Sequence, residues 1–153
     1  MAPEKQLTRT EYMEWRKGNT NPDVCSFCDE DRQIVLKRYP RWTWIATLAP
    51  YRPMHTMYMP NRHIETIQEL TVDEFIEFQQ IHDEGRSILR RLGEKRIIDI
   101  WRQRDDRLHK SGAPNAMHLH IHLMPDTEDM LNNILSEGAA DPIHLRRLRQ
   151  EIG

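Results

Sequence analysis

Three histidines alternate with apolar residues in "MHLHIHLMP", residues 117–125, and no other feature of the chain restricts its fold as strongly. Successive side chains of a β-strand point to opposite faces of the sheet, so His118, His120 and His122 would share one face. The intervening leucine and isoleucine side chains would share the other face, where a core can bury them. Adjacent histidines would then lie about 7 Å apart, at twice the rise per residue. The pattern predicts a strand with one apolar face and one imidazole face.

For a single histidine, a semi-buried polar side chain on an amphipathic strand would be the simplest interpretation. Three in strict alternation, in a chain with 8 histidines, favour a metal site or a catalytic site instead. The unperturbed imidazole pKa of about 6.5 allows a neutral nucleophile and a protonated donor to coexist near neutral pH. The residues alone leave open whether the strand meets a metal, a phosphate or both.

Length and composition limit the class of protein. With 153 residues we expect a single domain, made of an N-terminal arm or helix (1–24), a core (25–125) and a helical tail (126–153). The net charge of −2 lacks the basic excess typical of proteins that bind nucleic-acid polymers. No apolar run approaches the roughly 18 residues of a membrane span, and no signal peptide is recognisable. We therefore expect a soluble, cytoplasmic protein.

Segments rich in β-branched and aromatic residues predict about five strands. One long helix is expected between the third and fourth strands, from its cap at Thr71, with Glu74 three positions on, to its end at Gly93. Its apolar stripe at helical spacing consists of Phe75, Phe78, Ile81, Ile88, Leu89 and Leu92. This order favours an α+β fold, in which helices pack on an antiparallel sheet. The expected strands are 33–40, 41–50, 54–60, 96–103 and 116–125, and the expected short helices are 7–17, 128–138 and 143–153.

Two cysteines, Cys25 and Cys28, lie close together in "CSFC". A reducing cytosol argues against a structural disulfide between them. Their spacing is compatible with a metal site, with a thioredoxin-type redox pair or with two buried thiols. A redox pair would require a βαβ context that the sequence does not show, so a metal site is favoured.

Three motifs of the sequence, taken in order, resemble those of a known family. Residues 118–124, "HLHIHLM", are similar to the motif of the histidine triad (HIT) superfamily, His-φ-His-φ-His-φ-φ with φ apolar. "CSFC", followed by two strands and "PMHTMYMPNRHIETIQEL", resembles the family's cysteine pair and its Pro-x-His strand that ends in Pro-x-x-His before the long helix. The resemblance runs from about Cys25 to Pro125. It implies a HIT-like fold and a nucleotide hydrolase or transferase that acts at the α-phosphate of a nucleotide conjugate or dinucleoside polyphosphate, commonly as a homodimer.

The resemblance also implies roles for individual histidines. His120 matches the nucleophile, which would form a nucleotidyl-histidine intermediate that water or another acceptor resolves. His122 would contact the phosphoryl oxygens or assist the leaving group, and a protonated imidazole would do so through a charge-assisted hydrogen bond. His55 matches the histidine that completes the site from the adjacent strand. Without the resemblance, an ordinary edge-strand histidine is an equal alternative for His55.

Zinc-containing members of the superfamily hold a structural zinc with the cysteine pair, the histidine before the long helix and the first histidine of the triad. The matching residues are Cys25, Cys28, His63 and His118. Such a closed Cys2His2 set would be structural, which leaves the chemistry to His120.

Two stretches depart from the family pattern. Members commonly carry Gln and then Ser or Thr just before the triad, whereas this chain has Pro114 and Asn115. Proline offers no N–H and no side-chain donor, so Asn115 is the remaining donor for the phosphate or leaving group. The residue aligned with the family's ribose-binding Asp or Asn is Thr47, whose hydroxyl cannot reproduce bidentate acceptance by a carboxylate. A different nucleoside selectivity is therefore expected.

Several alternatives stay open at this stage. Trp42 and Trp44 are expected in the core or at a dimer contact, with base stacking as the alternative. Residues 102–112, "RQRDDRLHKSG", are expected to form a solvated loop whose cations could reach a phosphate tail. The loss of a donor at Pro114 favours a zinc-stabilised nucleotide-binding module with little catalysis as a second function. A third is a metalloenzyme that uses the histidines as an open metal site.

Overall fold

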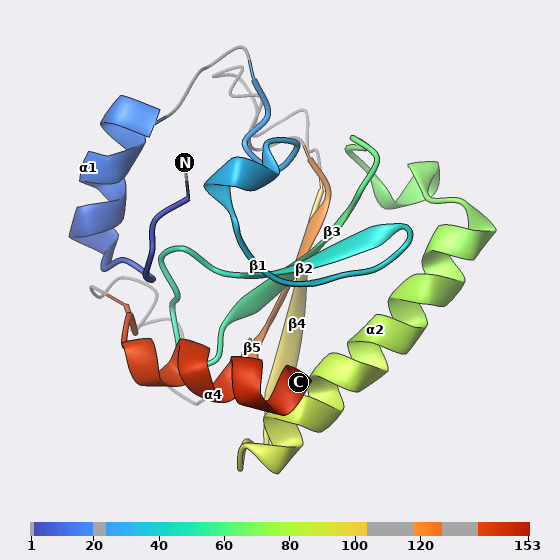
Figure 1. The fold of residues 1–153 in the computed structure, drawn as a ribbon. Helices are drawn as coiled ribbons and strands as arrows, with labels where there is room; N and C mark the ends of the chain where they lie inside the picture. Colours follow the sequence, from blue (N-terminus) through green and yellow to red (C-terminus); the bar gives the residue numbers. More distant parts are fainter. Residues whose placement is uncertain (1, 20–23, 104–117, 127–137) are drawn as a thin grey trace.

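Five strands form one antiparallel sheet in the order β1-β2-β3-β5-β4. The computed structural model describes residues 2–19, 24–103, 118–126 and 138–153, and the predicted helix 128–138 lies almost wholly outside them. Helices α1 and α2 lie on opposite sides of the sheet (Figure 1), which confirms the predicted α+β fold. The helices are α1 (Arg9–Asn19), η1 (Glu30–Arg32), η2 (Ile67–Glu69), α2 (Val72–Arg91) and α4 (Pro142–Ile152), and the strands are β1 (Ile34–Arg38), β2 (Trp42–Ala46), β3 (Thr56–Pro60), β4 (Ile97–Arg102) and β5 (His120–Pro125).

Helix α2 is the predicted long helix. Its first turn is closed by a capping box: Thr71 Oγ1 accepts from the Glu74 N–H at 3.1 Å, and the Glu74 carboxylate accepts from the Thr71 N–H at 3.0 Å. Gly93, with φ of +99°, follows the helix end. The prediction that Phe75 belongs to the apolar stripe is wrong, because Phe75 is 49% exposed. In the first turn of α2 the buried side chain is that of Glu74. The Glu74 carboxylate is satisfied there by Arg62 at 2.6 Å.

The alternation in β5 sorts its side chains as predicted. Leu119, Ile121 and Leu123 are completely buried in the core that faces α2. Trp42 and Trp44 belong to the same core, and Trp42 Nε1–H donates to the carbonyl of Glu74 in α2 at 2.8 Å. These tryptophans are therefore core residues and are not placed to stack on a base beside the histidines. By the same parity, His120 and His122 lie on the opposite face of the sheet.

The terminal helices are held against this framework. Helix α4 begins with Asp141 as its cap, whose carboxylate accepts from the Ile143 N–H at 3.0 Å, and it buries Leu145. Tyr12 and Trp15 of α1 pack against the apolar cluster that contains Leu145. No helix in the described part of the chain is long and apolar enough to cross a membrane.

Candidate functional site

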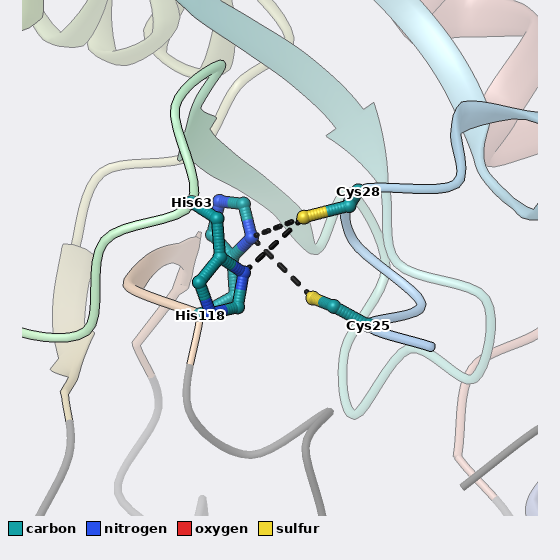
Figure 2. A group of neighbouring side chains, drawn as sticks. All are labelled: Cys25, Cys28, His63 and His118. Carbon is teal, nitrogen blue, oxygen red and sulfur yellow. Dashed lines mark hydrogen bonds between the residues drawn. The ribbon is translucent and has the colours of Figure 1, made fainter. Parts of the chain in front are cut away.

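The four predicted metal ligands come together beside the start of β5 (Figure 2). Cys25 and Cys28 come from the segment before η1, His63 from the turn after β3, and His118 from the residue pair that precedes β5. Cys28 Sγ lies 3.2 Å from His63 Nδ1 and 3.5 Å from His118 Nδ1, and all four ligand atoms lie within 4.8 Å of one another. A tetrahedron with Zn–S bonds of about 2.3 Å and Zn–N bonds of about 2.0 Å has edges of about 3.5 Å. The cluster therefore fits Zn²⁺, as the sequence predicted.

The chemistry of the donor set agrees with this geometry. His118 Nε2 lies 2.9 Å from the carbonyl of Pro60, and a carbonyl can only accept, so the proton is on Nε2 and the Nδ1 lone pair faces the thiols. Burial, followed by the neighbouring Cys25 thiol, raises the pKa of the Cys28 thiol to about 11. A divalent cation reverses this effect because it stabilises the thiolate. Two adjacent thiols and two oriented imidazoles are thus suited to a cation.

One backbone contact determines which ring nitrogen of His120 can act as a nucleophile. Its Nδ1 lies 2.8 Å from the carbonyl of His118 and must donate to it, which leaves the lone pair on Nε2. Burial lowers the pKa of His120; the bond to His118 opposes this, and the Arg102 guanidinium adds to the lowering. The neutral, nucleophilic form is therefore favoured at neutral pH.

His55 and His122 form a directed hydrogen-bond chain. The Tyr51 backbone N–H donates to His55 Nδ1 at 3.1 Å, so His55 carries its proton on Nε2. That Nε2–H donates to His122 Nδ1 at 2.7 Å, which leaves the His122 proton on Nε2 as a donor. Burial, followed by repulsion from His55, lowers the pKa of His122 well below its ordinary value. In the free protein His122 is consequently a neutral donor, and not the protonated imidazole considered from the sequence.

The backbone before His55 takes an unusual conformation. Met54 is buried and has φ of +66°, the left-handed region that non-glycine residues rarely occupy. The chain therefore turns at Met54, and β3 begins at Thr56 instead of at residue 54 as predicted. Such backbone strain is typical of functional sites, where it orients a particular side chain. Here the side chain that follows the turn is His55.

Burial of His55 predicts a pH-dependent stability. Burial, with a smaller contribution from His120, lowers the pKa of His55 to about 3, whereas an unfolded chain titrates near about 6.5. Below about pH 6.5 the unfolded state binds a proton that the folded state excludes, so stability is complete above that pH and falls as the pH drops towards about 3. Between pH 7 and pH 5 the loss from His55 is roughly 2 kcal/mol.

Urea denaturation of the wild type and of His55→Asn at pH 7.0 and 5.0 measures this contribution. The free energy of unfolding should fall less in the variant, by roughly 2 kcal/mol over this interval. Titrating groups away from His55, including the zinc-site histidines, are common to both proteins and cancel in the comparison. The pKa of His122 is lowered in part by His55, so its change in the variant adds to the difference in the same direction. An equal fall in the two proteins would contradict the assignment.

A cavity of about 500 Å³ opens on the histidine face and is lined by His120, His122 and Thr47. Thr47 is buried, and its Oγ1 has no hydrogen-bond partner among the described residues. Two aromatic rings accompany the histidines: Phe27 stacks on His120 with ring centroids 4.7 Å apart, and Tyr51 stacks on His122 at 6.0 Å. The cavity thus combines apolar walls with a few convergent polar groups, as small-molecule sites do. Asn115, the predicted donor, lies outside the described residues.

The structure adds residues that the sequence did not assign to the site. Arg102 was expected both at the end of the strand 96–103 and at the start of the loop 102–112. It is the last residue of β4 and pairs with His120 across the sheet, so both side chains occupy one face. The alternation in "RIIDIWRQ" predicts which side chains share a face of the strand with Arg102, but only the register between β4 and β5 places Arg102 beside His120. Phe27 had a weak signal, because it lies between the two cysteines. The contribution of α1 to the cavity had no signal at all.

This fold and this site define a protein of the histidine triad superfamily. The chain belongs to the family described as "Scavenger mRNA decapping enzyme C-term binding", whose model matches residues 23–135. No curated protein matches the sequence.

Solved structures share the fold at low sequence identity. A zinc-bound histidine triad family protein from Mycobacterium smegmatis has 16% identity and a TM-score of 0.65, with 86% of this chain and 95% of that chain covered. An ADP-glucose phosphorylase from Arabidopsis thaliana with bound ADP-glucose has 10% identity and a TM-score of 0.69, with 90% of this chain covered. The match covers 46% of that enzyme and 50% of a uridylyltransferase mutant that has 16% identity and a TM-score of 0.65, so this chain spans about half of their length.

Proposed function

We propose that this protein is a nucleotide hydrolase or nucleotidyl transferase that acts at the α-phosphate of a nucleotide conjugate or dinucleoside polyphosphate. The observation that carries the proposal is the pair of complementary imidazoles at one cavity: His120 with its lone pair on Nε2, and His122 with its proton on Nε2. One is prepared to attack phosphorus and the other to donate to a phosphoryl oxygen. Family membership supports nucleotide chemistry, and the neighbour with bound ADP-glucose supports a nucleotide-conjugate ligand.

The reaction would proceed in two displacements. In the first, the His120 Nε2 lone pair forms a bond to the α-phosphorus while the bond from phosphorus to the leaving group breaks, and the leaving group departs with that electron pair. In the second, water or another acceptor attacks phosphorus and loses its proton to solvent, while the P–N bond breaks and its electron pair returns to His120. His122 would donate to a non-bridging oxygen, with its orientation maintained by His55. Thr47, with its unsatisfied hydroxyl, would bind the ribose, and Asn115 would bind the phosphate or leaving group.

We further propose that Cys25, Cys28, His63 and His118 hold a structural zinc. When bound, zinc would supply a stable four-ligand crosslink, with no position left open for substrate. This arrangement argues against the open metal site considered from the sequence, because His118 turns away from the cavity that His120 and His122 line. The zinc-bound neighbour supports this assignment.

A homodimer and a cytoplasmic location remain part of the proposal. Exposed apolar side chains support self-association: Val72, Phe75 and Ile76 form one face of the first turns of α2 and are 75%, 49% and 52% exposed. Light scattering during gel filtration measures the mass directly, and a mass of one chain at micromolar concentration would contradict the dimer.

Trapping the covalent intermediate tests the proposed reaction. The P–N bond of a nucleotidyl-histidine hydrolyses in acid, so turnover of adenosine and guanosine phosphoramidates and dinucleoside polyphosphates is quenched with denaturant at alkaline pH. We expect a protein mass increased by one nucleotidyl group. Peptide mapping should place this group on His120. Nucleotide binding without any adduct or product would favour the alternative of a non-catalytic nucleotide-binding module. Zinc content measured on the same sample should be one ion per chain.

A further inference from the structure

Helix α1 forms the wall of the cavity opposite the histidines. Its side chains that line the cavity recur at helical spacing, so one face of α1 is directed towards the site. Tyr12 and Trp15 also pack against the cluster at Leu48, which anchors the helix in this position. The residues of α1 that line the cavity are Arg9, Tyr12, Met13, Trp15, Arg16 and Asn19.

The cavity has a marked charge asymmetry. Arg9 and Arg16 of α1, Arg32 of η1 and Arg102 of β4 line it, and none of the described residues that line it is acidic. Asp29 neutralises part of this charge, because its carboxylate lies 3.1 Å from Arg32 Nε. Arg32 Nη1 nevertheless remains buried without a hydrogen-bond partner among the described residues. The described residues that line the cavity therefore carry a positive net charge.

The arginines of α1 line a different part of the cavity wall from Arg102, and each contacts an aromatic ring. Arg102 is the cation beside His120, because the two residues pair across the sheet. Arg9 instead lies with its guanidinium carbon 5.7 Å from the centre of the Tyr51 ring, and Tyr51 in turn stacks on His122. Arg9 and His122, the proposed donor to a phosphoryl oxygen, thus both contact the Tyr51 ring. Arg16 lies about two helical turns further along the same wall, with its guanidinium carbon 5.7 Å from the centre of the Tyr12 ring.

We propose that Arg9 and Arg16 of α1 bind a second anionic group of the ligand and so select diphosphate or longer conjugates over monophosphate conjugates. The inference rests on the proposed function, since it takes the first phosphate to lie at His120 and His122. Guanidinium groups suit this role because they stay charged and bind phosphate in a bidentate manner. Helix α1 is then a specificity element of the site.

Binding measurements with two matched nucleotides test this role. We expect wild type to bind α,β-methylene-ADP, which it cannot cleave between the phosphates, at least about ten-fold more tightly than AMP, with the preference decreasing as salt increases. In Arg9→Gln/Arg16→Gln the ratio of the two affinities should fall towards one. Lys17→Gln is the control: it removes the same charge from α1, but Lys17 is exposed, pairs with Glu14 at 2.6 Å and does not line the cavity. The same comparison with the corresponding guanosine nucleotides tests whether the preference depends on the base.

The outcomes separate the two proposals. If no nucleotide binds wild type and no adduct forms, the proposed function fails and this inference fails with it. If AMP binds and the adduct forms, but wild type shows no preference for the diphosphate, the inference alone is overturned. The inference is likewise overturned if Lys17→Gln removes the preference as fully as the double variant does. The overall positive charge of α1, and not contact with Arg9 and Arg16, would then explain the preference. The inference is supported if the double variant loses the preference for the diphosphate, Lys17→Gln keeps it, and the melting temperature of the double variant equals that of wild type.

Discussion

Replacement of His120 by asparagine is expected to reduce kcat by at least about 10³-fold and to abolish the covalent adduct. The structure gives the reason: the Nε2 lone pair of His120 is the nucleophile oriented at the cavity, and asparagine has no equivalent nitrogen. The asparagine amide can still donate to the His118 carbonyl, as His120 Nδ1 does, so the strand should retain its local structure. The affinity for substrate should change much less than kcat.

Single-turnover kinetics and intact mass measure this effect together. His144→Asn is a matched control, because His144 lies on α4 and does not line the cavity. The control should keep the adduct and a kcat within about two-fold of wild type. Adduct formation or full turnover in His120→Asn would exclude His120 as the nucleophile.

Loss of the zinc site is expected to have the largest effect on stability. In Cys28→Ser we expect zinc to be lost and the free energy of unfolding to fall by at least about 3 kcal/mol, which corresponds to about 10 °C in Tm. The physical reason is that the four ligands crosslink the segment before η1, the turn after β3 and the start of β5, which are distant in sequence. Treatment of wild type with a strong chelator should give the same decrease.

Thermal unfolding with zinc analysis tests this prediction. Ser26→Ala is the control, because Ser26 lies between the cysteines but contributes no ligand. Activity should fall along with stability, since Phe27 in the same turn stacks on His120. A Cys28→Ser protein that lacks zinc but melts at the wild-type temperature would show that the crosslink does not stabilise the fold.

Features with a local cause could be predicted well from the sequence. The parity of β5 follows from alternating backbone directions, so the burial of Leu119 and Ile121 opposite His120 required no tertiary information. The start of α2 at Thr71 followed from a capping box of neighbouring residues. The metal ligands were found because the resemblance linked motifs that are far apart in the chain. Phe75 was misplaced because helical spacing alone does not show where the buried stripe is centred.

The sequence by itself therefore determined which faces of its strands and helices are apolar, and which histidines and cysteines are available for chemistry. Only the tertiary structure decided how these side chains are used. The tautomers of His55, His120 and His122 depend on backbone groups that folding brings to each ring. The position of Arg102 depends on the register between β4 and β5, and the cationic wall depends on where α1 docks. Periodicity is encoded by neighbours along the chain, whereas proton positions and local charge depend on contacts between segments that meet only after folding.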